Sequence, residues 1–135
     1  MKKALLLFAV ALMVVSCRDT EIGTNMKTIN LVANPGDWTV NVDQNGQNRF
    51  YSCHFPMPEI NSRVCNYGSV STYFLDNTLQ QPLPYVRHYQ DINAFWTKTI
   101  DYDYSIGGMN IYVTNSDFAV DPPTTTMNFR VVVMW

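Results

Sequence analysis

Apolar and polar residues alternate along most of the chain after position 27, and this period of two is typical of strands that are buried on one face. In the segment 28–33, for example, Ile29, Leu31 and Ala33 share one face. Turn-forming pairs such as Asn45-Gly46, which tolerate a positive φ, separate these segments. The pattern predicts strands at 28–33, 38–42, 50–55, 70–75, 85–89, 96–104, 109–113 and 129–135.

One segment has a helical period instead. Ile60, Val64 and Tyr67 are spaced as on one face of a helix, so we expect one or two helical turns within 59–67. Gly68 stands where a glycine commonly ends a helix.

The fold class follows from the number and spacing of the strands. About eight short strands with turn signals between them predict an all-β domain, an antiparallel β-sandwich of immunoglobulin-like or jelly-roll type with one short helix. The valine run 131–133 predicts that the last strand is buried on both faces.

The N-terminus has a different pattern, that of an export signal. Two lysines at 2–3 precede an unbroken apolar run at 4–15, which is too short for a membrane-spanning helix of about 20 residues. Val-Val-Ser-Cys at 14–17 resembles the bacterial lipobox, in which the cysteine thiol receives a diacylglyceryl group. We therefore expect a lipoprotein signal peptide at 1–16 and lipidation of Cys17, with a plain signal peptide as the alternative.

The polar segment 17–27 is predicted to be a short tether that carries the lipid and leads into a domain at 28–135. Arg18 follows the lipidated cysteine, and aspartate there would favour the inner membrane, so we expect the outer membrane. Asp19 and Glu21 loosely resemble an acidic surface-export signal. A solvated tether explains them equally well, so the periplasmic and cell-surface sides both stay open.

Composition narrows the classes of function. Without the two lysines of the signal, seven basic residues face eleven acidic ones, and this scattered, mildly acidic charge excludes a nucleic-acid-binding surface. Charged residues make up 15% of the chain, below the usual quarter, while aromatic residues make up 13%.

The residues that commonly carry catalysis form no convincing set. Cys53 and His54 are adjacent in a strand and point to opposite faces, and no signature supports a nucleophilic cysteine paired with His88. The segment that begins with Asp101 to Ser105 superficially resembles a calcium loop. Its glycine, however, falls at loop position 7 instead of 6, and its twelfth residue is Tyr112, where a bidentate Glu is needed. We therefore expect no catalytic site, no metal site and no cofactor. Cys53 and Cys65 form either a disulfide or two free thiols.

A cluster of aromatic residues is the candidate ligand-binding feature. Tyr85, Arg87 and Tyr89 share one face of a predicted strand, and Trp96 follows shortly after. Such rings could line a binding surface, although sandwich cores are also rich in aromatic residues.

Several short motifs resemble those of a known group of proteins. They are Pro-Glu-Ile at 58–60, Gly-Ser-Val at 68–70, Leu-Pro-Tyr at 83–85, Tyr-Ser-Ile-Gly at 104–107 and Phe-Arg-Val-Val-Val at 129–133. In this order they resemble short lipoproteins and collagen-like-repeat proteins of Bacteroides-type bacteria, which share a β-domain ending in a strand similar to "FRVVI". The resemblance covers most of 38–135 and implies the fold and the location, but it implies no activity. This chain lacks the collagen-like repeats.

Two functional hypotheses remain after these exclusions. The first is a non-enzymatic cell-envelope lipoprotein that presents its sandwich to a protein partner. The alternative is a carbohydrate-binding accessory lipoprotein, which an aromatic surface flanked by Asp and Asn would favour. An enzyme is the third possibility, and a deep pocket holding His88 with a carboxylate would support it.

Overall fold

The computed structural model describes residues 25–117 and 122–135. The predicted signal peptide 1–16, the lipidation site Cys17 and most of the predicted tether lie outside these residues. Met26 and Lys27, which we assigned to the tether, are the first two residues of strand β1 (Met26–Ala33) and pair with the last strand of the chain.

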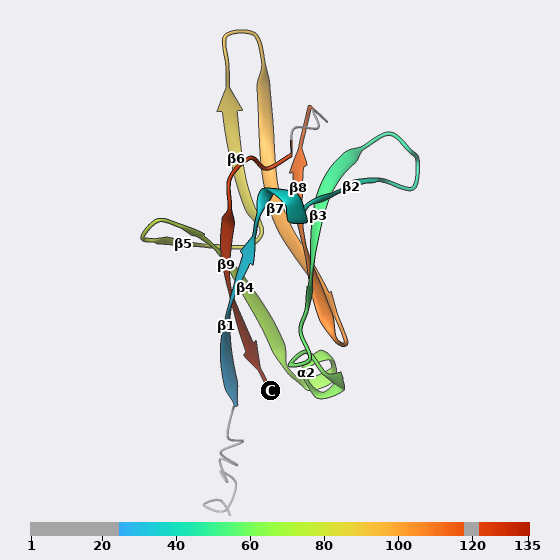
Figure 1. Ribbon diagram of the computed structural model, residues 1–135, viewed down its shortest axis with the longest axis vertical. Helices are drawn as coiled ribbons and strands as arrows, with labels where there is room; N and C mark the ends of the chain where they lie inside the picture. Colours follow the sequence, from blue (N-terminus) through green and yellow to red (C-terminus); the bar gives the residue numbers. More distant parts are fainter. Residues whose placement is uncertain (1–24, 118–121) are drawn as a thin grey trace, which may run out of the picture.

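The described residues form two antiparallel sheets packed as a sandwich, so the predicted fold class is confirmed (Figure 1). The four-stranded sheet has the order β1, β9 (Met127–Met134), β4 (Ser69–Asp76) and β5 (Leu79–Pro82). The five-stranded sheet has the order β2 (Thr39–Val42), β3 (Arg49–Pro56), β8 (Gly108–Asn115), β7 (Phe95–Ser105) and β6 (Tyr85–Gln90).

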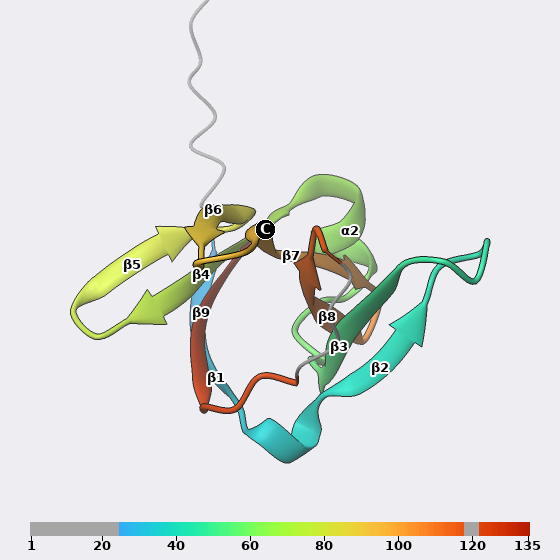
Figure 2. The ribbon, with the colours of Figure 1, turned by 90° about the horizontal axis from the view of Figure 1, so that it is seen from above.

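The chain crosses repeatedly between the two sheets. From above, the sheets are two layers, and the short helix η2 (Pro35–Asp37) carries the chain from β1 to β2 along one side (Figure 2). The connection from β5 to β6 returns the chain to the five-stranded sheet and contains a cis peptide bond at Leu83-Pro84. Both edges of the sandwich therefore have a covalent connection between layers.

Strand β5 was missed by the sequence pattern, so the structure has one strand more than the eight predicted. Asn77 has a φ of 52° and turns the chain from β4 into β5, and Pro82 is the last residue of the pairing, opposite Tyr73. β5 lies at the edge of its sheet, where a proline without an N–H donor is tolerated.

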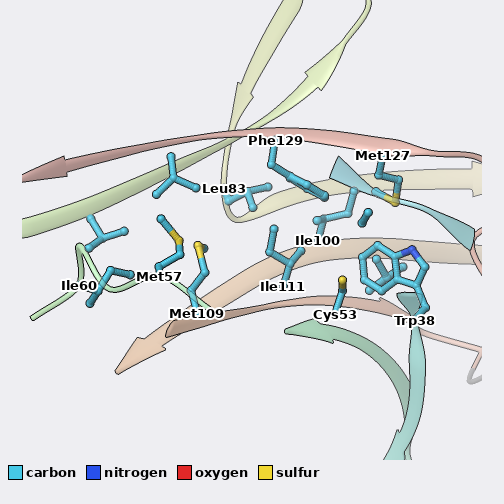
Figure 3. Packing of buried hydrophobic residues seen from close by; sticks show 14 of the residues in the cluster. Trp38, Cys53, Met57, Ile60, Leu83, Ile100, Met109, Ile111, Met127 and Phe129 are labelled. Atoms are coloured by element: carbon cyan, nitrogen blue, oxygen red, sulfur yellow. The ribbon is translucent and has the colours of Figure 1, made fainter. Parts of the chain in front are cut away.

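The core lies between the layers and is built from the alternating apolar residues of both sheets. Phe129 and Met127 of β9 lie across from Ile111 of β8 and Ile100 of β7 (Figure 3). All four side chains are buried, and burial of one such side chain contributes about 2 kcal/mol. Met109, Ile111 and Val113, which alternate along β8, are all buried on its inner face.

The expectation that the valine run is buried on both faces is wrong. Val131 and Val133 are fully buried, but Val132 between them is only half-buried. The strand is central in its sheet and alternates like its neighbours, because its outer face has no covering layer in the described chain.

The predicted short helix forms within 59–67 as α2 (Ser62–Tyr67), which begins at Ser62 and is six residues long. Asn61 caps it, accepting hydrogen bonds from the backbone N–H groups of Arg63 and Val64. Ile60 is buried in the turn before the helix, whereas Tyr67 is 86% exposed, so the helical period that suggested these residues was partly coincidental. Gly68 ends the helix with an extended backbone instead of a left-handed one.

Candidate functional site

The β6–β7 hairpin brings the predicted aromatic residues together. In its antiparallel register Tyr89 lies opposite Trp96, Arg87 opposite Lys98, and Tyr85 opposite Ile100. Residues directly opposite in a pair of strands point to the same side, so these six side chains form one strip on the inner face of the five-stranded sheet.

The strip changes from buried to open along the hairpin. Ile100 is buried at one end, Lys98 and Trp96 are half-buried, and Tyr89 is 38% exposed near the tip. The hairpin extends beyond the ends of β4 and β9, so the four-stranded sheet does not cover the inner face near the tip (Figure 1). The rings near the tip of the hairpin are uncovered because β6 and β7 reach beyond the strands that face them.

A groove of about 560 Å³ opens where the strip loses its cover. Ile100, Val113 and Met127 give it an apolar lining toward the core, and Tyr89 and Trp96 line it toward the hairpin tip. Apart from the tyrosines, its polar lining comes from six side chains: Asp76, Lys98, Asn115, Asp117, Thr124 and Thr125. The volume lies within the range of small-molecule sites.

The rings in the groove are held by one another. Tyr89 and Trp96 stack with their centroids 5.5 Å apart and an interplanar angle of 13°. Tyr85 contacts Phe74 of the opposite sheet in a tilted arrangement, with the centroids 5.8 Å apart and an interplanar angle of 54°. Burial raises the pKa of the Tyr85 phenol above its usual value, with the charge of Tyr89 as a smaller cause. Side chains already held in place lose less entropy when a ligand binds.

Each of the two cations on the strip lies over a tyrosine ring. The guanidinium carbon of Arg87 is 5.3 Å from the centroid of Tyr85, and Nζ of Lys98 is 5.6 Å from the centroid of Tyr89. Both contacts have the geometry of a cation–π interaction.

Three of the four predicted ligand-binding residues line this groove, namely Tyr85, Tyr89 and Trp96. Arg87 does not line it but touches Tyr85 beside it. The sequence did not point to Lys98 as a site residue, although its alternation with Ile100 was visible. Asp76 and Asp117 were also missed, because nothing local places them beside the hairpin.

The two histidines lie away from the groove. His88 is on the outer face of β6, where its Nδ1 shares a hydrogen bond of 2.8 Å with Oγ1 of Thr97. His54, on the outer face of β3, shares one of 2.8 Å with Oδ1 of Asn110. The pocket with His88 and a carboxylate that would have supported an enzyme is therefore not formed by this groove.

Polar side chains of the outer face continue from His54 as one network. Nδ2 of Asn110 and the hydroxyl of Tyr112 both donate hydrogen bonds of 2.8 Å to Asp103. Burial, and then the charge of Asp103, raises the pKa of Asp101 above its usual value. The segment from Asp101 to Ser105 is strand, as its period of two predicted, and not a calcium loop.

Cys53 and Cys65 are free thiols in the structure, the second of the two alternatives. Cys53 is buried on the inner face of β3, and Cys65 is exposed on α2. Burial raises the pKa of the Cys53 thiol, and Asp37 raises it further. Neither sulfur lines the groove.

Metal ligation and membrane-spanning helices were considered for residues 25–117 and 122–135. No three of their His, Cys, Asp or Glu side chains are grouped so that they could hold a metal ion. None of their helices is long and apolar enough to cross a membrane.

Comparison of the chain with family models, with curated proteins and with solved structures finds no match. The chain is therefore classified by its own geometry, as an antiparallel two-sheet β-sandwich with an aromatic groove at one end.

Proposed function

We propose that this chain is a carbohydrate-binding lipoprotein of the cell envelope and that the groove beside the β6–β7 hairpin holds the glycan. The observation that carries the proposal is the stacked pair Tyr89 and Trp96 in a groove that also contains Asn115, Asp76 and Asp117. An aromatic surface flanked by Asp and Asn is the feature that favoured this hypothesis over a protein partner.

The chemistry of a sugar fits both parts of this lining. A pyranose ring has an apolar face of C–H groups, which packs on an aromatic ring, and a rim of hydroxyl groups that need hydrogen-bond partners. Carboxylate oxygens of Asp76 and Asp117 can accept from such hydroxyls, and an amide such as that of Asn115 can both donate and accept.

The arrangement of the domain supports presentation away from a membrane. Strand β1 begins at one end of the sandwich, and the tip of the β6–β7 hairpin is at the opposite end (Figure 1). A lipid on Cys17, a few residues before β1, would hold the first end close to the membrane and expose the groove. We expect the outer membrane, with the periplasmic or surface side left to experiment.

The lipid anchor is tested separately from the ligand. Cells fed radiolabelled palmitate should label the wild-type protein and the Cys65→Ala variant, but not the Cys17→Ala variant. Persistent labelling of Cys17→Ala would show that the anchor is attached elsewhere.

Binding is tested with the purified full-length protein in detergent on a glycan array, followed by titration of tryptophan fluorescence with each hit. Saturable binding should be lost in Trp96→Ala and weakened at least tenfold in Tyr89→Ala, since each removes one ring of the stack. Tyr67→Ala is the matched control, because Tyr67 is 86% exposed on α2 and does not line the groove. An array without hits would reject the proposal.

A protein partner is the second candidate, favoured by the apolar tip of the hairpin. Ile92 is 94% exposed there and Phe95 is 76% exposed. Crosslinking on intact cells should then capture one partner with the wild-type protein and lose it with Ile92→Ser. The Trp96→Ala variant would retain that partner, which separates the two candidates.

A further inference from the structure

Arg87 and Lys98 are directly opposite each other on neighbouring strands and on the same face. Opposed residues in an antiparallel pair have Cβ atoms about 5 Å apart, and from there the guanidinium of Arg87 extends over the ring of Tyr85 and the ammonium of Lys98 over the ring of Tyr89. The aromatic strip thus contains a pair of adjacent cations between Tyr85 and the Tyr89–Trp96 stack.

Neither cation is neutralised by an acid among the described residues. The salt bridge of the described residues joins Lys27 to Glu59, away from the hairpin, whereas Arg87 contacts the ring of Tyr85 and Lys98 the ring of Tyr89. A ring face attracts a cation more weakly than a hydrogen-bonded carboxylate does. A carboxylate would therefore be a stronger partner for these two cations than the tyrosine rings are.

We infer that the groove takes an acidic glycan and that the carboxylate of a uronic acid residue lies between Arg87 and Lys98. This inference rests on the proposed function, because it assigns the class of sugar to the same groove. A carboxylate has two oxygens, so it can accept hydrogen bonds from the guanidinium and the ammonium at once. The neighbouring sugar ring then lies against the Tyr89–Trp96 stack.

The acidic side chains of the groove restrict which anion fits. Asp76 and Asp117 line the same groove as Lys98, so a densely sulfated chain would bring several negative charges close to two carboxylates. A glycan with one carboxylate per sugar places its charge on the cation pair and its hydroxyls near the aspartates. The lining therefore favours a polyuronate over a polysulfate.

The test uses two probes with the same sugar backbone, a hexamer of galacturonic acid and its fully methyl-esterified form, in which each carboxylate is replaced by an uncharged methyl ester. Purified full-length protein in detergent is titrated with each by tryptophan fluorescence at low and at high salt. We expect the acid to bind at least tenfold more tightly than the ester and to weaken as salt rises. Arg87→Gln and Lys98→Gln should each weaken binding of the acid about tenfold, without changing the affinity for the ester.

Lys27→Gln is the matched control, because Lys27 is a cation of β1, outside the groove, and its substitution should leave both affinities unchanged. Arg87→Gln removes the cation–π contact with Tyr85, and Lys98→Gln removes the one with Tyr89, so each variant should keep a cooperative urea transition with a midpoint only slightly below that of the wild type. This measurement separates loss of binding from loss of folding.

Each contrary result has its own meaning. If the ester binds as tightly as the acid, and only Trp96→Ala abolishes binding, the uronic acid assignment fails while the glycan-binding function stands. If neither hexamer binds and the array has no hits, both proposals fail. If a hexamer of glutamate binds at least as tightly as the hexamer of galacturonic acid, the cation pair recognises an acidic protein segment and the inference is overturned.

Discussion

The hydroxyl of Tyr102 in β7 donates a hydrogen bond of 2.8 Å to the backbone carbonyl of Val70 in β4. The two residues belong to different sheets, so this bond crosses the sandwich. Tyr102 is half-buried and Val70 is buried. A polar bond in this position joins the two layers and complements the apolar contacts of the core.

We expect Tyr102→Phe to lower the free energy of unfolding by about 1 kcal/mol, because it removes this bond and leaves a buried carbonyl oxygen without the donor. Urea denaturation followed by circular dichroism measures the change. Tyr67→Phe, at an exposed position on α2, should have no effect. Equal midpoints for Tyr102→Phe and the wild type would contradict a stabilising role for the bond.

Stability should also fall in alkaline solution, partly through the same residue. Burial raises the pKa of the Tyr102 phenol above its usual value, and the neighbouring Tyr104 adds to this. Above about pH 10 the unfolded chain releases the phenol proton while the folded chain still holds it, so unfolding becomes easier as pH rises toward the folded-state pKa. The slope of urea midpoint against pH should be smaller in Tyr102→Phe, and an unchanged slope would refute the assignment.

Asp101 and Asp103 should respond in opposite ways to substitution by asparagine. Burial and the charge of Asp103 raise the pKa of Asp101, so its ionised form is disfavoured in the folded state, and Asp101→Asn should raise the melting temperature at pH 7. Asp103 accepts hydrogen bonds from Asn110 and Tyr112, and Asp103→Asn should cost about 1 kcal/mol. Differential scanning calorimetry of both variants tests this, and a stabilised Asp103→Asn would contradict it.

Gly68→Ala should destabilise the domain by about 1–3 kcal/mol. A Cβ at this position would overlap the backbone carbonyl oxygen of Met134, which a backbone shift alone can relieve. Gly36→Ala is the control, since a Cβ there meets no atom within 4 Å, and its effect should be small. Urea denaturation of both variants measures the effect, as the difference of each midpoint from that of the wild type. Tolerance of Gly68→Ala would mean that the end of β9 moves freely.

The two free cysteines should differ in reactivity. Cys65 is exposed on α2 and should react with iodoacetamide in the native protein, whereas Cys53 is buried, with a raised thiol pKa, and should react only in denaturant. Mass spectrometry of the tryptic peptides locates each label. Protection of both residues until a reductant is added would indicate a disulfide between them.

The alternation of residues predicted most of the strands and the direction of their side chains, because that information is local. The inner faces of β1, β3 and β8 agree with it, and so does the shared face of Tyr85, Arg87 and Tyr89. The prediction from alternation failed where the position of a strand in the sheet decided its pairing or the burial of its side chains. β5 forms despite Pro82 because an edge strand tolerates proline, and Val132 stays half-exposed although its neighbours are buried.

What the sequence alone determined was the fold class and the shared face of Tyr85, Arg87 and Tyr89, since both depend on a period of two that any strand must obey. Only the tertiary structure decided that Lys98 lies opposite Arg87, because strand register depends on the whole hairpin. It also decided that Asp76 and Met127 of the other sheet join Trp96 in one groove. Those contacts come from the packing of two layers, and residues far apart in the chain carry no local signal of it.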